Sequence, residues 1–410
     1  MKKKFLILFG VLLICGAGVH LSAKTVVIRG AEIHTMDGRI IKKGAILIKE
    51  GKIAEIGDDV SIPENAEIIQ AEGFILYPGF VAASCLLTSK EIKNFESFSP
   101  DTSALDRFDI FGDYTRYVAG GVTSVYVGMP YNRLISGRGA VVKFGGAGQE
   151  SKVVRREAAL NVSLGKDAVL PPMTDIFPAP ISPENPLLPS LKQYPSSVLG
   201  AYWIMNALFR FDQYSGDLAR YMENISASLR RAQENRLPLV VRCQKAADIF
   251  QSVELAKILG MPLIIQGGAE AYKLAGMLKE NNVSVIAEAF VRPNGLSPKE
   301  EPLSEDGIRI YEKNIPALIK EGITVAIAPD IDSSVPELLW VARYYQKFGT
   351  SEEELIKAIT INPARMFGVA QKIGSLERGK DADILFFRKE SGKLLLQLKK
   401  VMIEGRIIYE

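Results

Sequence analysis

The residue types that usually hold metal ions or activate nucleophiles are scarce in this chain. Its 410 residues contain two histidines, His20 and His34, and three cysteines, Cys15, Cys85 and Cys243. Common zinc sites are built from imidazole and thiolate side chains, and a catalytic serine needs an adjacent base. The sequence therefore predicts neither a histidine-built metal centre nor a serine–histidine pair. Its chemistry must rest on carboxylates, guanidinium groups and amides.

The first 23 residues predict a secretory signal peptide. Lysines at 2–4 form a positive start, residues 5–19 form an apolar run, and Ala23 is a small residue suited to cleavage. An uncleaved anchor is one alternative, although the run is shorter than the roughly 20 residues that span a bilayer. A lipoprotein anchor on Cys15 is another. We expect cleavage after Ala23, and a periplasmic or secreted protein with no membrane attachment.

The charge balance argues against nucleic acid as a partner. The whole chain has 50 lysines and arginines against 47 acidic residues, and loss of the three signal-peptide lysines leaves a mature net charge of zero. Binding to nucleic acid or to an anionic membrane through bulk charge is therefore not expected. With 47% hydrophobic and 24% charged residues, the composition is that of a globular protein.

The elements that must position any site fall into two kinds. Short β-rich runs with glycine-containing turns stand at both ends of the mature chain, at 25–28, 45–48, 52–56, 383–387, 394–399 and 401–403. Between them, strand-like runs alternate with helical stretches, at 106–119, 121–127, 239–241, 246–259, 262–265, 270–280, 283–287 and 323–328. This alternation indicates βα units around a parallel sheet. We predict an α/β fold, with a (β/α)8 TIM-like barrel over 78–370 and a small β-sandwich built from 24–77 and 371–410.

Residues 165–200 interrupt the alternation. They contain eight prolines, which excludes a helix or a central strand. We predict a long extended loop between two barrel units. Two roles stay open for it: a lid or binding loop over the barrel, and a strap packed along the barrel wall.

Four stretches, at 51–53, 73–80, 358–368 and 374–384, together resemble the amidohydrolase superfamily. The stretch 121–143 is similar to a loop of its imidazolonepropionase-like, exported members. The resemblance covers nearly all of 24–410. It implies a hydrolase with divalent ions, such as zinc, at the C-terminal mouth of the barrel, where they lower the pKa of a bound water and polarise the scissile carbonyl.

The chain departs from that family at the metal ligands. The two histidine positions of the first barrel strand fall on Ser84 and Leu86. The fifth strand carries Arg242 in place of an inward ligand, and the histidine position of the sixth falls near Gly267. Only the last strand keeps its acid, since Asp330 matches the family's aspartate. A shifted alignment cannot supply histidines that the chain lacks.

We therefore predict no metal cofactor. Asp330 is the candidate catalytic residue, and Ser84, Arg242 and Gln244 are candidate substrate-binding residues. A buried carboxylate without a metal must pair or become protonated. The prediction is that Arg242 pairs with Asp330, and a hydrated Asp330 in an open mouth is the alternative.

Three replacement chemistries are conceivable. Cys85 and Cys243 are expected to point toward the helices as buried free thiols, on strands too far apart for a shared metal or a disulfide. Ser84 lacks a base and is better interpreted as a small polar filler. A calcium or magnesium site of oxygen ligands remains an alternative, built from Asp330, Asp332, Glu288 and Gln244.

Two functions are compatible with these residues. The first is an exported amidohydrolase-like protein that has lost catalysis and acts by binding. It would do so as a homodimer, as a heteromer with an active paralogue, or through a small-molecule ligand in the barrel mouth. The second is an active hydrolase on carbon–nitrogen bonds of non-peptide amides or dipeptide-like molecules, with an atypical metal or metal-free site.

Overall fold

The computed structural model describes residues 25–87, 98–131, 133–145, 152–165, 168–169, 195–209, 217–289, 312–389 and 396–410. The predicted signal peptide and most of the proline-rich segment lie outside these residues. The end of that segment is described, and a helix already begins there at Val198. In the described part of the chain, no helix has the length and apolar character needed to span a bilayer.

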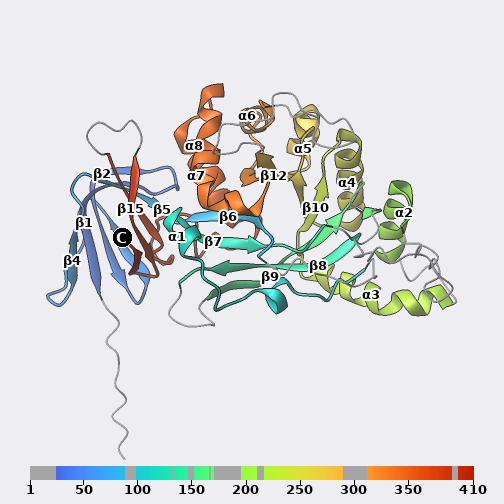
Figure 1. The fold of residues 1–410 in the computed structure, drawn as a ribbon, viewed down its shortest axis with the longest axis horizontal. Coiled ribbons are helices and arrows are strands. Elements are labelled where there is room, and N and C mark those ends of the chain that lie inside the picture. Colours follow the sequence, from blue (N-terminus) through green and yellow to red (C-terminus); the bar gives the residue numbers. More distant parts are fainter. Residues whose placement is uncertain are drawn as a thin grey trace, which may run out of the picture.

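A β-domain is built from both ends of the chain, as predicted (Figure 1). Its strands are β1 (Val26–His34), β2 (Ile40–Lys49), β3 (Lys52–Gly57), β4 (Glu67–Gln70), β5 (Phe74–Pro78), β14 (Ile384–Arg388), β15 (Gln397–Ile403) and β16 (Arg406–Tyr409). They form one eight-stranded sheet in the order β16-β15-β14-β5-β1-β2-β3, and β4 also pairs with β1. The expected sandwich is thus one sheet that branches at β1.

The C-terminal strands differ in one respect from the sequence prediction. Two runs were expected at 394–399 and 401–403, but β15 is continuous. Its pairing with β14 shifts register between Phe386 and Phe387, which face Lys400 and Leu398. A bulge of this kind accommodates one extra residue without ending the strand.

A second eight-stranded sheet forms the barrel, in the order β13-β12-β11-β10-β9-β8-β7-β6. Its strands are β6 (Phe80–Cys85), β7 (Val122–Val127), β8 (Ile135–Lys143), β9 (Val153–Ser163), β10 (Leu239–Cys243), β11 (Leu263–Gly267), β12 (Ser284–Ala289) and β13 (Val325–Pro329). β8 runs antiparallel to both β7 and β9, and the other neighbours pair in parallel. The barrel is therefore TIM-like, with a β-hairpin in place of one βα unit.

Helices lie along the outer side of the barrel at β10, β11 and β13, and α1 lies against β7 (Figure 1). They are α1 (Thr115–Ala119), α2 (Val198–Phe209), α3 (Asp217–Glu234), α4 (Ala246–Leu259), α5 (Ala275–Glu280), α6 (Asn314–Lys320), α7 (Leu338–Arg343), α8 (Glu352–Ala358) and α9 (Ile361–Met366). The 3-10 helices of the described ranges include η1 (Ala104–Arg107), η5 (Ala271–Leu274), η6 (Asp332–Glu337) and η7 (Tyr344–Phe348). The helix predicted at 246–259 is confirmed. The one predicted at 106–119 is replaced by η1 and α1, because a turn at Asp109–Gly112 separates them.

The seam between β6 and β13 is closed by the chain around α9. The Val81 amide donates to the Ile359 carbonyl at 2.8 Å. The Asn362 side chain donates to the Val325 carbonyl, also at 2.8 Å. Each bond satisfies a backbone group at a strand edge that has no neighbouring strand. This is the structural role of the stretch at 358–368 that the sequence singled out.

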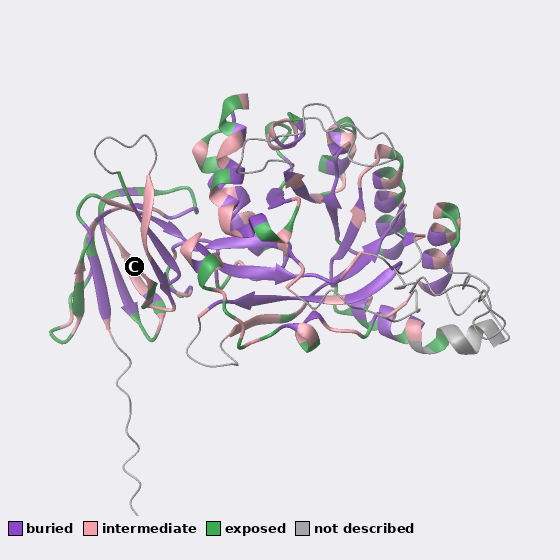
Figure 2. Cartoon of the chain, viewed as in Figure 1, coloured by how far each residue is buried: buried purple, intermediate pink, exposed green. Residues whose placement is uncertain are grey.

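The barrel interior begins with an apolar layer. Inward residues such as Val240, Ile264 and Ile286 pack in one buried cluster with Tyr126 and Phe367. The rings of Tyr126 and Phe367 stack with centroids 3.9 Å apart. Figure 2 shows the strands buried on both faces, with exposed residues confined mainly to the outer helices and loops. The polar residues of the barrel mouth lie directly above this apolar layer, toward the C-terminal ends of the strands.

Candidate functional site

A layer of polar side chains lies directly above the apolar layer. Arg242 follows Val240 by two residues on β10, Gln266 follows Ile264 on β11, and Glu288 follows Ile286 on β12. Side chains two residues apart on a strand share one face, so all three point into the barrel. Because these strands are parallel, the three residues lie at the same, C-terminal end of the barrel, where barrel enzymes place their active sites.

Arg242, Gln244 and Glu288 form the first part of a polar network. Arg242 Nη1 makes an ion pair with Glu288 Oε1. Gln244 Nε2 donates to Glu288 Oε2 at 3.1 Å, and Gln244 Oε1 accepts the Ala269 amide at 3.0 Å. Both carboxylate oxygens of Glu288 are therefore engaged. The Glu288 side chain is 7% exposed and that of Arg242 is 20% exposed, so the ion pair is largely shielded from water.

Ser84, Gln266 and Tyr131 form the second part. Gln266 Nε2 donates to Ser84 Oγ at 2.8 Å and also to the Tyr131 hydroxyl. The Ser84 and Tyr131 hydroxyls are 3.2 Å apart. The Arg242 guanidinium lies over the Tyr131 ring, 4.4 Å from its centroid, which joins the two parts through a cation–π contact.

Burial keeps the Tyr131 hydroxyl neutral. Burial is the largest cause that raises the pKa of Tyr131, Arg242 opposes it and Glu288 adds to it, and the pKa is raised to about 12. Near neutral pH, Tyr131 therefore acts as a hydrogen-bonding group and not as a base. The hydroxyl of Ser84 and the amide of Gln266 also carry no charge. The network is therefore a set of hydrogen-bonded polar groups, and it contains no imidazole that could exchange a proton near neutral pH.

The structure brings three of the predicted site residues into this one network. Ser84, Arg242 and Gln244 all belong to it. Asp330 follows the last residue of β13 and is half-buried at the mouth. The partner recorded for Arg242 here is Glu288, and the predicted pairing of Arg242 with Asp330 stays a prediction.

Sequence reasoning missed two members of the network and misassigned a third. Gln266 carried a usable signal, because it lies two residues beyond the buried Ile264. Tyr131 carried none, since it lies in the loop after β7 where no periodicity applies. Glu288 was considered as an oxygen ligand of a metal or as a solvated loop residue, whereas it lies on β12 and is the carboxylate partner of Arg242.

Asp332 and Leu86 are joined by a hydrogen bond. Asp332 Oδ2 accepts the Leu86 amide at 2.8 Å, so η6 holds the end of β6. The pairing of β6 with β7 shifts register between Ala82 and Cys85. This irregularity lets Ser84 reach the barrel interior while Cys85 packs in the outer core.

The two cysteines of the described chain are buried and free. Cys243 Sγ lies 3.8 Å from Ser252 Oγ on α4, so it faces the helices as predicted. Burial raises the pKa of the Cys85 thiol, with a further contribution from Asp332. A thiol held in its neutral form is a poor metal ligand.

The residues at the mouth do not fit the divalent ion that the family resemblance implies. No group of three or more histidine, cysteine, aspartate or glutamate side chains comes together within the described ranges. The layer offers a guanidinium, amides and hydroxyls, and the Glu288 carboxylate is held by Arg242. His34 lies in the β-domain at the end of β1, 2.8 Å from Glu32. Of the proposed oxygen ligands, Gln244 and Asp332 already bond to other groups.

Comparison with known sequences connects this geometry to one group of proteins. Residues 228–408 match the profile of the Amidohydrolase family. Over 158 residues, the chain is 29% identical to imidazolonepropionase of Porphyromonas gingivalis, which covers 35% of this chain and 37% of that protein. Over 80 residues, it is 38% identical to adenine deaminase of Moorella thermoacetica, and the match covers 20% of this chain and 13% of that protein. The matched region thus spans well under half of these curated relatives.

Solved structures with the same architecture extend the comparison to nearly the whole chain. An amidohydrolase from Thermotoga maritima superposes with a TM-score of 0.73 at 24% identity, covering 94% of this chain and 99% of that one. A putative prolidase from Bifidobacterium longum gives a TM-score of 0.56 at 15% identity, with 95% of each chain covered. At these identities the similarity establishes the fold, and it confirms the predicted barrel and β-domain.

Proposed function

The chain belongs to the amidohydrolase superfamily, and we propose that it is a member that has lost metal-dependent hydrolysis and acts by binding. The ion pair between Arg242 and Glu288 is the observation that carries this proposal. It places a fixed positive charge in the layer where the resembled enzymes hold a cation. A guanidinium cannot be deprotonated in a protein, so it offers no lone pair to a divalent ion at any accessible pH.

The rest of the network supports the same conclusion. Ser84 and Gln266 bond to each other, and Gln244 is held by Glu288 and the Ala269 amide. Fully bonded polar networks give a barrel interior rigidity without requiring a ligand. A small molecule in the mouth would have to compete with these bonds. We therefore favour a partner-subunit role, and keep a mouth ligand held by Ser84, Arg242 and Gln244 as a second form.

The partner in this proposal is a similar chain, either a second copy or an active paralogue. Such a paralogue would carry the histidines that this chain lacks. Affinity purification of the tagged full chain from its own source, followed by mass spectrometry, should recover that paralogue in a stoichiometric amount. Recovery of this chain alone would count against the heteromer.

We also propose that the chain acts outside the cytoplasm. The lysines at 2–4, the apolar run at 5–19 and the small residue Ala23 support an exported precursor. Sequencing the N-terminus of the chain from the periplasmic or secreted fraction should begin at Lys24. A chain that keeps residues 1–23 would contradict this part of the proposal.

The deciding experiment is elemental analysis of the mature chain, 24–410, purified without chelator or added metal. We expect far less than one zinc, iron, manganese, nickel or cobalt ion per chain. A variant with imidazoles restored, Ser84→His/Leu86→His/Arg242→His, serves as the matched control and should retain more zinc after equal exposure. About one tightly bound ion in the unmodified chain would overturn the proposal.

The rival function is hydrolysis of carbon–nitrogen bonds at an atypical site. The names of the matched relatives, imidazolonepropionase and adenine deaminase, and the position of Asp330 at the end of β13 favour it. Incubation of the mature chain with panels of cyclic amides and dipeptides would test it. Turnover that Asp330→Asn abolishes, while Asp332→Asn leaves it largely intact, would establish Asp330 as the catalytic residue.

A further inference from the structure

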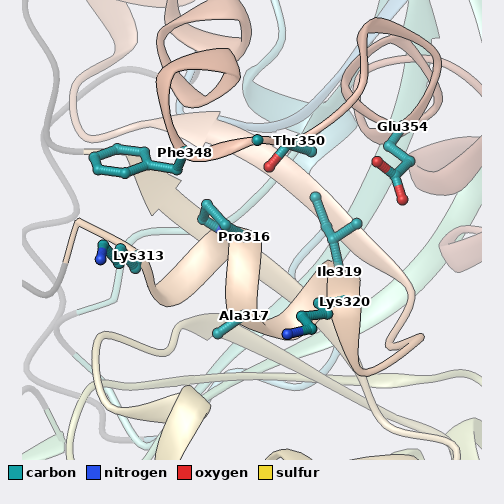
Figure 3. Close-up of a pocket in the computed structure, with 9 residues that line it drawn as sticks. Lys313, Pro316, Ala317, Ile319, Lys320, Phe348, Thr350 and Glu354 are labelled. Carbon is teal, nitrogen blue, oxygen red and sulfur yellow. The ribbon is translucent and has the colours of Figure 1, made fainter.

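A groove of about 350 Å³ opens in the helical layer of the barrel, between α6 and the segment that joins η7 to α8 (Figure 3). Pro316, Ile319 and Phe348 give it an apolar lining, and Thr350 adds a hydroxyl. None of these residues belongs to the polar network of the barrel mouth. The groove is therefore a separate feature, and its capacity to bind a partner does not depend on whether the mouth binds metal.

Two lysines flank the groove. Lys313 caps the start of α6 and Lys320 is its last residue. Seven residues of helix place their Cα atoms about 10.5 Å apart along the axis. Figure 3 shows Lys313 on the side of Phe348 and Lys320 below Ile319. Within the described part of the chain, no ion pair is recorded for either ammonium group.

Two acidic residues, Glu354 and Glu312, lie near the groove and are engaged by other groups. Glu354 accepts the Ser351 amide at 3.0 Å and the Ser351 hydroxyl at 2.7 Å in a capping box. Glu312 bonds to the Tyr344 hydroxyl and lies 3.5 Å from Lys347. The apolar lining of the groove favours an apolar group, and Lys313 and Lys320 at its ends favour a negative charge on each side of that group.

The same chain presents such a group at the turn before α1. Phe111 is 75% exposed. The turn beneath it is firmly held, because the Gly112 amide donates to the Asp109 carbonyl at 3.2 Å and the Phe111 amide to Asp109 Oδ1 at 2.9 Å. Lys152 Nζ also donates to the Ile110 carbonyl at 2.6 Å. A rigid turn loses little conformational entropy when it binds, so it suits recognition.

Acidic residues stand on both sides of Phe111. Asp109 and Asp113 are both exposed. A turn brings the Cα atoms of Asp109 and Gly112 within about 7 Å, and one further residue adds at most about 3.8 Å. The Cα atoms of Asp109 and Asp113 are therefore at most about 10.8 Å apart, a span that the flexible side chains of Lys313 and Lys320 can reach.

We propose that the groove of one molecule binds the Phe111 turn of a second copy of this chain. Phe111 would enter the apolar lining, and Asp109 and Asp113 would face the two lysines. The second copy is favoured as the partner because its own turn offers an exposed aromatic ring between two acidic residues, which matches the apolar lining and the two lysines of the groove. Electrostatic complementarity of this kind fixes register and excludes partners with the opposite pattern.

The contact joins two different surfaces and is therefore heterologous. α1, which follows the turn, packs against β15 and β16 of the β-domain, whereas α6 packs against β13, η5 and η7 of the barrel. A head-to-tail contact of this kind produces a closed ring or an open chain, not a two-fold dimer. One side chain and its charged flanks make a small interface, so association should be weak and sensitive to salt.

Sedimentation velocity of the mature chain tests the proposal, between about 1 and 200 μM because small interfaces associate weakly. We expect the weight-average sedimentation coefficient to rise with concentration at low salt and to fall in about 0.5 M salt. Phe111→Ser and Lys313→Glu/Lys320→Glu should each raise the dissociation constant at least ten-fold. Leu199→Ser, at an 80% exposed apolar residue on α2, is the matched control and should leave association unchanged.

Mixing the two variants gives the sharper outcome. Phe111→Ser keeps an intact groove, and Lys313→Glu/Lys320→Glu keeps an intact turn. Each variant alone should associate at least ten-fold more weakly than the unmodified chain, yet an equimolar mixture should form one-to-one dimers that cannot grow further. Circular dichroism confirms that each variant is folded. A wild type that stays monomeric throughout, variants that associate normally, or a mixture that stays monomeric would each overturn the proposal.

Discussion

Lys143 Nζ lies 2.5 Å from Asp381 Oδ2, and this ion pair joins the barrel to the β-domain. Lys143 is the last residue of β8, and Asp381 precedes β14. The Lys143 side chain is only 1% exposed, and Asp383 and Glu404 approach it at 3.1 and 3.3 Å. A buried ammonium group is therefore balanced by three carboxylates from the other domain.

Replacing this ammonium should be strongly destabilising. Lys143→Met leaves three carboxylates close together without their cation, and breaking a buried pair typically costs about 3–5 kcal/mol. Urea denaturation should show the loss as a lower midpoint. Lys52→Met is the control, because Lys52 contacts the same Asp381 at 2.8 Å with its side chain 55% exposed, and should cost less than about 1 kcal/mol. Equal effects of the two substitutions would contradict a buried role for Lys143.

This junction also indicates what the sequence can and cannot predict. The alternation of strands and helices predicted the barrel, and the similar β-rich runs at both termini predicted the shared β-domain. Strands β8 and β9 were not predicted, because the stretch 121–143 was interpreted as similar to a loop, whereas 135–143 forms β8 and runs antiparallel to β7 and β9. Lys143 was not singled out, since its partner Asp381 lies more than 200 residues away in sequence.

The ion pair in the barrel mouth predicts a measurable coupling. Arg242→Met leaves the Glu288 carboxylate, 7% exposed, without its cation, and should cost about 3 kcal/mol. Arg242→Met/Glu288→Leu should recover most of that loss, because no charge remains buried. A double-mutant cycle by urea denaturation measures the difference. The exposed pair of Arg116 and Glu337 at 2.8 Å is the control and should couple by less than about 1 kcal/mol. Additive effects at Arg242 and Glu288 would contradict the pairing.

The candidate site shows why such partners are hard to predict from sequence. Strand periodicity placed Arg242 inside the barrel, and the same parity identifies Gln266 and Glu288. Which inward residue Arg242 would bond depends on barrel curvature and side-chain reach, and Glu288 lies 46 residues away. Tyr131 comes from a loop, where no period fixes the direction of a side chain. Sequence patterns therefore predict which residues form the polar layer of the barrel mouth better than they predict which of those residues bond to each other.

The Tyr131 hydroxyl predicts a specific loss of stability in alkali. Its pKa is raised from 10.0 to about 12 in the folded state, mainly by burial. A raised pKa contributes stability that is complete below the unfolded pKa and is lost as pH rises through the folded pKa. Between pH 9 and 11, Tyr131 should therefore account for about 1 kcal/mol of the loss. Urea denaturation at both pH values should show a correspondingly smaller drop for Tyr131→Phe than for the unmodified chain. Equal drops would mean that the hydroxyl is not shielded.

Gly120 makes a steric prediction that separates close packing from helix propensity. It ends α1 with a φ of −82°, which any residue adopts, but a Cβ there would lie 2.0 Å from the Pro336 carbonyl oxygen of η6. Because that neighbour is backbone, relief requires α1 or η6 to move, and overpacking of this kind costs about 1–3 kcal/mol. Gly276 lies in α5 with nothing within 4 Å of an added Cβ, so Gly276→Ala should instead stabilise by up to about 1 kcal/mol. Thermal denaturation should thus move in opposite directions for Gly120→Ala and Gly276→Ala. If both alanine variants melt higher than the unmodified chain, the close contact between α1 and η6 does not exist in solution.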